Sequence, residues 1–233
     1  MSRFTGTGVA LITPFNENLT VDYNGLKKLV EHQINNGTDY LVIQGTTGES
    51  ATLNADEKNA VLDYVIDINN KRLPIVLGIG GNNTKAVAET IANTDLSQVD
   101  GVLSVSPYYN KPSQEGIYQH YKTIAQETDK PIILYNVPGR TRSNVESDTT
   151  LRLAHDVKNI VAIKEASGDL EQAIRIIKNK PKDFTVISGE DALTLPLMSI
   201  GVEGVISVVA NAFPKVFSTM VSAMLSGNLK EAA

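Results

Sequence analysis

Short apolar runs alternate with amphipathic stretches along almost the whole chain. The runs hold four to six residues, are rich in Val, Ile and Leu, and lack the alternation of a strand with one solvated face. Such runs are typical of strands buried on both faces, as in a parallel sheet covered by helices. The sequence predicts eight strands, at 8–13, 40–43, 74–77, 101–105, 131–135, 160–163, 184–188 and 204–208.

The stretches between these runs repeat apolar residues at helical spacing. Leu26, Val30 and Ile34 mark one such face. Asn54, followed three residues later by Glu57, predicts a capping box at the start of the second helix. The predicted helices cover 22–36, 54–70, 83–94, 113–128, 146–154, 170–179, 192–200 and 214–226.

Eight strand–helix units without a linker or a shift in composition favour an α/β fold, the (β/α)8 TIM barrel. A doubly wound open sheet is the alternative, but it usually has fewer strands. Its nucleotide-binding motif is also incomplete, because the run 78–81 (Gly-Ile-Gly-Gly) lacks the third glycine and the later acidic residue. We expect the barrel to occupy residues 1–226 and residues 227–233 to begin a truncated C-terminal helical region.

Composition narrows the class of function. The chain has 233 residues, is 42% hydrophobic and carries a net charge of −5, so it can bury a large core and offers nucleic acid no basic surface. Without cysteine it has no disulfide, thiolate metal site or thiol nucleophile. The N-terminal residues lack the long apolar core of a signal peptide, and no apolar run approaches membrane-spanning length. We therefore expect a cytoplasmic protein with no nucleic-acid or membrane partner.

Metal chemistry has no support in the sequence. No cluster of His, Asp and Glu has the spacing of metal ligands. The three histidines, His32, His120 and His155, lie on or at the end of predicted helices and are expected at the surface.

Polar side chains follow the predicted strands at the end where a TIM barrel places its active site. Lys164 ends the apolar run 160–163. It is either an ordinary solvated residue or a desolvated amine of lowered pKa that acts as a Schiff-base nucleophile. Other strand ends carry hydroxyls and a guanidinium, at Thr46, Thr47, Tyr108, Tyr109, Tyr135 and Arg140.

Each of these side chains has an ordinary interpretation as a packing or loop residue. As a set they supply an amine, hydroxyls for proton transfer, and groups that bind carboxylates. That combination suits Schiff-base carbon–carbon bond formation on a 2-oxo acid.

Four motifs, taken in this order, resemble those of the dihydrodipicolinate synthase family. They are 45–49 (Gly-Thr-Thr-Gly-Glu), 107–110 (Pro-Tyr-Tyr-Asn), 135–141 (Tyr-Asn-Val-Pro-Gly-Arg-Thr) and 163–166 (Ile-Lys-Glu-Ala). The resemblance extends from Gly6 to Ala233. Other pyruvate-dependent class I aldolases, including N-acetylneuraminate lyase, share the lysine, the tyrosine and the glycine-rich loop. The setting of Arg140 favours the synthase.

The resemblance implies condensation of pyruvate with L-aspartate 4-semialdehyde to 4-hydroxy-tetrahydrodipicolinate, a step of lysine and diaminopimelate biosynthesis, without cofactor or metal. It implies that Lys164 is the nucleophile and that Tyr135, Thr46 and Tyr109 relay protons, with Tyr109 reaching in from a neighbouring subunit of a homodimer or homotetramer. The implied substrate-binding residues are Thr47, Arg140, Gly189 and Ile206.

The alternatives are another 2-oxo-acid aldolase such as N-acetylneuraminate lyase, or an inactive truncated barrel. The second arises because family members continue for some tens of residues beyond the position of Ala233. We expect absent outer helices to expose apolar surface, lower stability and alter assembly.

Feedback inhibition by lysine is expected to be weak or absent. In inhibited family members the effector lies at positions that match Ser50, Ala51, Asn82 and Tyr108, beside two histidines and a glutamate. Those last three positions are Ala55, Lys58 and Ala86 here, so a cationic effector loses an acidic partner and meets a like charge.

Overall fold

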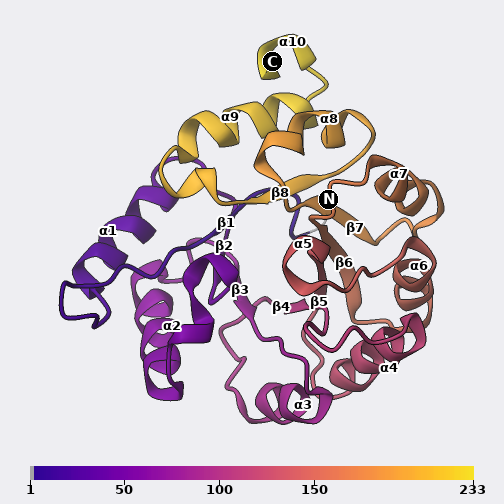
Figure 1. Cartoon of the computed structure of the whole chain (residues 1–233). Coiled ribbons are helices and arrows are strands. Elements are labelled where there is room, and N and C mark those ends of the chain that lie inside the picture. The colour runs from indigo at the N-terminus through magenta and orange to yellow at the C-terminus, as the bar shows by residue number, and fades with distance from the viewer. Residues whose placement is uncertain (1–2) are drawn as a thin grey trace.

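Eight parallel strands close into a barrel in the order β1 to β8, and β8 pairs with β1 to complete the ring. The computed structural model describes residues 3–233, and Figure 1 shows the strands at its centre with helices around them. The strands are β1 Gly6–Ala10, β2 Tyr40–Ile43, β3 Ile75–Gly78, β4 Gly101–Val105, β5 Ile132–Asn136, β6 Ile160–Glu165, β7 Thr185–Ser188 and β8 Gly204–Ser207. The predicted TIM barrel is confirmed.

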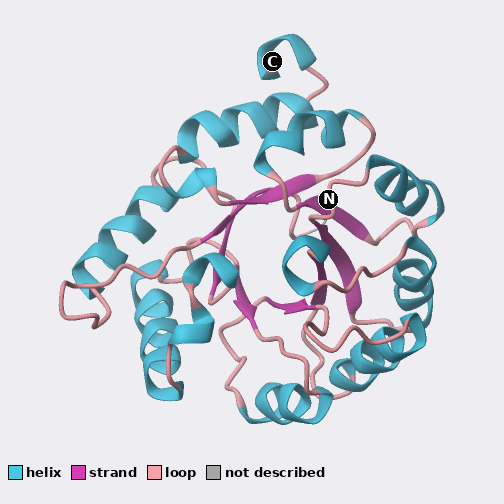
Figure 2. Cartoon of the chain, viewed as in Figure 1, coloured by secondary structure: helices cyan, strands magenta, loops and turns pink. Residues whose placement is uncertain are grey.

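A helix follows each strand and covers the outside of the barrel, as Figure 2 shows. The covering helices are α1 Tyr23–Ile34, α2 Ala55–Asn69, α3 Thr84–Asn93, α4 Gln114–Ala125, α6 Ser147–Asp156, α7 Leu170–Asn179, α8 Thr194–Ser199 and α9 Pro214–Leu225. Shorter helical turns are η1 Thr46–Gly48, η2 Ser50–Thr52, α5 Pro138–Thr141, η3 Asp191–Leu193, η4 Val209–Asn211 and α10 Leu229–Ala232. Within residues 3–233 no helix is long and apolar enough to cross a membrane.

Two helices begin as the sequence predicts. In the capping box of α2, Asn54 accepts a hydrogen bond from the backbone N–H of Glu57, and Glu57 accepts one from that of Asn54, each at 2.9 Å. At the start of α10, the Asn228 side chain accepts from the backbone N–H of Glu231. These bonds satisfy N–H groups that have no partner inside a helix.

The first strand differs from its prediction of 8–13, because β1 begins at Gly6 and ends at Ala10. Leu11 still donates its backbone N–H to Val42, but the chain then leaves the ladder. The Thr13 hydroxyl donates to the carbonyl of Gly48 at 2.6 Å. The end of this apolar run therefore supports the turn behind β2 instead of extending the barrel.

Two apolar layers flank the strands, because successive side chains on a strand point to opposite faces. The inner layer fills the barrel and includes Val42, Ile133, Ala162, Ile187 and Ile206. The outer layer joins the strands to the covering helices. On β6, Ala162 belongs to the inner layer and the next residue, Ile163, to the outer one.

An irregularity in the pairing of β5 with β6 sets the register at the carboxyl ends of both strands. Ile132 pairs with Ile160, but the next residue, Ile133, pairs with Ala162. Val161 is thus an extra residue on β6, as in a β-bulge. Beyond this point the register places Tyr135 beside Lys164.

His120 corrects one expectation, because it is buried and not on the surface. It lies on the face of α4 that also carries Ile117, Tyr121 and Ile124, at the spacing of one helical face. Its Nδ1 is 2.9 Å from the Thr84 hydroxyl of α3, and burial lowers its pKa to about 4. Helical periodicity therefore determines its burial despite its polar ring. His32 and His155 are exposed, as predicted.

Candidate active site

Lys164 lies inside the barrel near the carboxyl end of β6, where only 4% of its surface is exposed. Burial lowers the pKa of its amine to about 8, and the carboxylates of Asp191 and Glu190 partly oppose this shift. About one amine in ten is then neutral at pH 7. The apolar side chains of the inner layer lie on the same face of β6 as the lysine, whereas Ile163 belongs to the outer layer. The interpretation of Lys164 as a solvated residue is therefore wrong.

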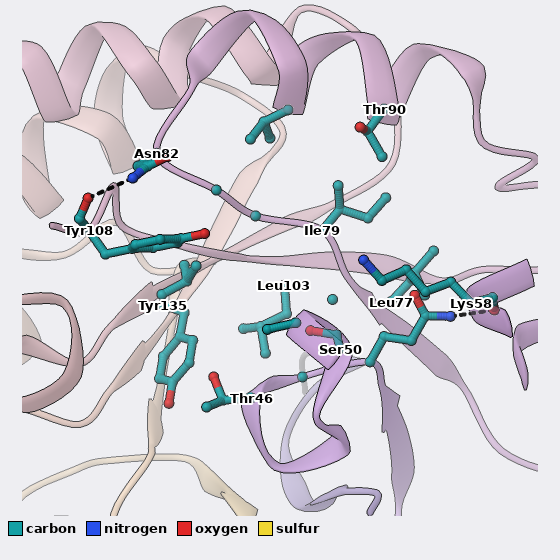
Figure 3. Close-up of a pocket in the computed structure, with 18 of the residues that line it drawn as sticks. Thr46, Ser50, Lys58, Leu77, Ile79, Asn82, Thr90, Leu103, Tyr108 and Tyr135 are labelled. Carbon is teal, nitrogen blue, oxygen red and sulfur yellow. Dashed lines mark hydrogen bonds between the residues drawn. The ribbon is translucent and has the colours of Figure 1, made fainter. Parts of the chain in front are cut away.

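Tyr135 is the neighbour of Lys164 on the adjacent strand. The two residues are paired across β5 and β6, and the Lys164 Nζ lies 4.4 Å from the centre of the Tyr135 ring. Burial raises the pKa of the Tyr135 phenol, while a hydrogen bond with the Thr46 side chain opposes the rise. Figure 3 shows the Tyr135 and Thr46 side chains facing each other at one end of the cavity. A hydroxyl pair thus stands beside a partly neutral amine.

Gly189 follows β7 and leaves room for the lysine side chain. A Cβ at this position would lie 3.0 Å from Lys164 Cε and 2.6 Å from Ala166 Cβ, so any larger residue would displace one of them. Ile206 of β8 is 1% exposed and belongs to the inner layer together with Tyr135. Gly189 thus lies against the lysine and Ile206 lies in the inner layer, and their part in substrate binding stays a prediction.

A cavity of about 740 Å³ opens at this end of the barrel and reaches outward between α2 and α3. Thr46 of η1, Tyr135 of β5 and Arg140 of α5 line it together. Thr47 is the next residue of η1 and is half-buried, but it does not line the cavity. Arg140 is exposed and stands close enough to act electrostatically on both Lys164 and Tyr135.

Tyr109 is the one proposed relay residue that lies apart from this group. Its side chain is 85% exposed, and its φ of +77° is in the left-handed region. Its backbone N–H donates to the carbonyl of Thr141 in α5 at 3.2 Å, which attaches the loop behind β4 to the loop behind β5. The expectation that Tyr109 acts in a neighbouring subunit stays a prediction.

The cavity also contains the positions at which the resemblance places a regulatory ligand. The Asn82 amide donates to the carbonyl of Tyr108 at 3.1 Å, and Figure 3 shows this bond on the side of the cavity away from Lys58. All seven of these positions line the cavity: Ser50, Ala51, Ala55, Lys58, Asn82, Ala86 and Tyr108.

Three acidic residues near the site were not predicted. Glu190 and Asp191, just after β7, act on the charge of Lys164. Glu165, the last residue of β6, is buried and accepts hydrogen bonds from Asn136 and Gln172. Their positions just beyond apolar strands were the available signal. In the described part of the chain, 3–233, no group of three or more His, Asp or Glu side chains could hold a metal ion.

Comparison with known proteins agrees with this geometry. The model of the dihydrodipicolinate synthetase family matches residues 3–233. A 4-hydroxy-tetrahydrodipicolinate synthase from Flavobacterium psychrophilum is 56% identical over 232 residues, which is 100% of this chain and 79% of the relative.

Solved structures of the family superimpose closely. The dihydrodipicolinate synthase from Aquifex aeolicus has a TM-score of 0.94 and is 43% identical, over 98% of this chain and 78% of that one. The enzyme from Cyanidioschyzon merolae, crystallised with lysine bound, has a TM-score of 0.95 and is 40% identical, over 100% of this chain and 79% of that one. The chain belongs to the dihydrodipicolinate synthetase family.

Proposed function

We propose that this chain is a lyase of the class I aldolase type that condenses pyruvate with L-aspartate 4-semialdehyde to give 4-hydroxy-tetrahydrodipicolinate. The observation that carries the proposal is the buried Lys164 paired with Tyr135 inside a barrel mouth. The 56% identity to a named synthase over the whole chain gives the reaction. It is a step of lysine and diaminopimelate biosynthesis.

Lys164 forms the covalent intermediate. A neutral amine attacks the ketone carbon of pyruvate, water leaves, and the resulting imine loses a proton from the methyl carbon to become an enamine. The lowered pKa supports this role, because an amine near its usual pKa of 10.5 would be almost wholly protonated at pH 7. The enamine carbon then attacks the aldehyde of the second substrate.

Tyr135 carries protons to and from this centre. Its phenol stands next to the amine and is hydrogen-bonded to Thr46, which lines the open cavity. A proton that leaves the carbinolamine can pass along this pair toward solvent. We assign the third relay position to Tyr109 of a second copy of the chain in a homo-oligomer, because in its own subunit the side chain is exposed.

The two substrate carboxylates need separate binding groups. Thr47 and the backbone N–H groups of η1 bind the carboxylate of pyruvate, since the first N–H groups of a helical turn have no partner within it. Arg140 lies farther out on α5 and binds the carboxylate of the aldehyde with its planar fork. Gly189 and Ile206 shape the floor around the lysine.

Borohydride trapping tests the proposal. Incubation with pyruvate and borohydride is expected to add one carboxyethyl group to the chain, and peptide mapping is expected to place it on Lys164. The trapped enzyme should have lost its turnover of pyruvate with aspartate 4-semialdehyde. An adduct on another lysine, no adduct in a folded protein, or cleavage of N-acetylneuraminate in place of the condensation would contradict it.

A further inference from the structure

Glu165 carries a buried carboxylate for which the proposed reaction has no use. It follows Lys164 on β6, so the two side chains point to opposite faces of the strand. Only 3% of Glu165 is exposed, and none of the ion pairs found in residues 3–233 includes it. A buried charge needs hydrogen bonds if no opposite charge is near. The hydrogen-bond donors around Glu165 therefore indicate its structural role.

Both oxygens of Glu165 accept hydrogen bonds. Oε1 accepts from the backbone N–H of Ser167 at 2.7 Å and from Asn136 Nδ2 at 3.2 Å. Oε2 accepts from Asn136 Nδ2 at 3.0 Å and from Gln172 Nε2 of α7 at 3.0 Å. A carboxylate can accept at both oxygens, whereas an amide would turn N–H groups toward one of these donors. The site is therefore specific for Glu over Gln.

Asn136 passes this constraint to the loop behind β5. It is fully buried, its Nδ2 donates to Asn144 Oδ1 at 2.8 Å, and its Oδ1 accepts from the backbone N–H of Val145 at 2.9 Å. Asn144 in turn donates to Gln172 Oε1 at 2.9 Å. Glu165, Asn136, Asn144 and Gln172 thus form a closed ring of hydrogen bonds, which we call the amide ring.

The amide ring fixes both ends of the segment that carries Arg140. Residues 137–143 begin directly after Asn136, the last residue of β5, and end directly before Asn144. The hydrogen bond between Asn136 and Asn144 joins these two ends, and α5 lies between them. The same segment holds the loop behind β4, through the bond from Tyr109 to Thr141. By contrast, Lys164 and Tyr135 are held by the ladder between β5 and β6.

We propose that Glu165 is a positioning residue that sets the affinity for the second substrate by holding segment 137–143 through the amide ring. The proposal rests on the proposed function, in which Arg140 binds the carboxylate of the aldehyde. The proposal predicts different effects on the two substrates. Loss of the Glu165 carboxylate weakens aldehyde binding, while imine formation between pyruvate and Lys164 continues.

The test is Glu165→Gln, compared with Glu171→Gln, which removes the same charge from an exposed position at the start of α7. For Glu165→Gln we expect the KM for aspartate 4-semialdehyde to rise at least about tenfold, as for the loss of a hydrogen bond to a charged group. The rate of borohydride trapping with pyruvate should change less than about twofold. Glu171→Gln should match the unmodified chain in both assays.

A compensating variant distinguishes positioning from general damage. Gln172→Glu alone places two carboxylates together and should also raise the KM for the aldehyde. In Glu165→Gln with Gln172→Glu, the new amide donates to the new carboxylate, so the KM should recover at least about threefold from that of Glu165→Gln. If Glu165→Gln fails to fold, Asn144→Ala breaks the amide ring outside the barrel and should give the same pattern.

An unchanged KM in a folded variant, an equal loss of pyruvate trapping, or a double variant as impaired as both single ones together would overturn the inference. These outcomes leave the proposed function intact. Turnover of the unmodified chain with both substrates tests the proposed function itself. If this chain traps pyruvate but does not turn over the aldehyde, the proposed function fails, and this inference fails with it.

Discussion

The two ends of the cavity differ in how their side chains are held. At the inner end, Tyr135 lines the cavity, and backbone pairing of its strand with the next one fixes its distance to Lys164. At the outer end, Lys58 and Thr90 belong to the sides of α2 and α3, and Figure 3 shows them far from Tyr135 across the cavity. A side chain on a covering helix can be substituted while the backbone of the barrel stays in place. The distance between Tyr135 and Lys164 depends instead on strand register, and a change of register moves every residue of the strand.

This difference predicts where substitutions matter. The inner end should tolerate almost no change, because we assign each group there a chemical role that depends on its position. The outer end should tolerate changes of charge and size, and those changes should alter regulation but not reaction. The predictions below test this contrast, beginning with the largest expected effect.

Lys164→Met should abolish both turnover and the pyruvate adduct, because it removes the amine that lies beside Tyr135. The variant should nevertheless be more stable. The pKa of Lys164 is lower in the folded chain, about 8, than the ordinary value of 10.5, so its burial destabilises the fold below pH 8 and the cost disappears as the pH rises through 10.5. We expect a gain of about 1–3 kcal/mol at pH 7 in urea unfolding. A variant less stable than the unmodified chain would contradict the lowered pKa of Lys164.

Tyr135→Phe should lower kcat by about 10²–10⁴-fold, the usual contribution of a general acid–base group. Pyruvate binding should weaken far less, since the phenol acts on protons in the transition state. Steady-state kinetics with both substrates would measure the two effects. A loss of kcat smaller than about threefold would mean that Tyr135 only packs against the lysine.

The rate of imine formation should rise with pH, because only the neutral amine attacks the ketone. With a pKa of about 8, the neutral fraction grows about tenfold per pH unit below pH 8 and then levels off. Trapping with pyruvate and cyanoborohydride between pH 6 and 9.5 would show this curve. A rate that still rises tenfold per unit above pH 9 would indicate an amine that is not desolvated.

Arg140→Ala should raise the KM for aspartate 4-semialdehyde by about 10–100-fold, the range for losing charge-assisted hydrogen bonds. The KM for pyruvate should stay within about threefold. Arg142→Ala, at an exposed position two residues further on, is the matched control. Equal changes in both KM values would contradict a role confined to the second substrate.

Lysine should cause no half-inhibition at sub-millimolar concentration, because Lys58 lines the outer end and the matching acidic residue is replaced by Ala86. Turnover assays over a lysine series would measure this. The variant with Ala55→His, Lys58→His and Ala86→Glu should become more sensitive while its uninhibited kcat stays within about twofold. Strong inhibition of the unmodified chain would show that these positions do not control the effector.

The sequence predicts the barrel well because each apolar run is long enough to identify a strand. It also predicts the residues at the strand ends, since a parallel barrel gathers all these ends at one mouth. It does not reveal η1, α5 and η4, because these turns of three or four residues are too short for a periodic pattern. Thr46 belongs to η1 and Arg140 to α5.

Two errors have a common physical cause. Polar residue type suggested exposure for His120 and left Glu165 without a role, yet both are buried. Each has a hydrogen-bond partner far away in sequence, Thr84 for His120 at 36 residues and Asn136 for Glu165 at 29 residues. Local patterns cannot show a hydrogen bond between distant segments, so buried polar groups are the least predictable part of the site.

The bulge at Val161 explains why Tyr135 and Lys164 lie opposite each other. Five residues of β5, from Ile132 to Asn136, face six residues of β6, from Ile160 to Glu165. If the pairing of Ile132 with Ile160 continued without the bulge, Tyr135 would face Ile163, an outer-layer residue, and Lys164 would lie one residue farther along. A designer who transfers the two strands to another barrel must therefore keep the register beyond the bulge. In this enzyme, one surplus residue determines which two side chains meet.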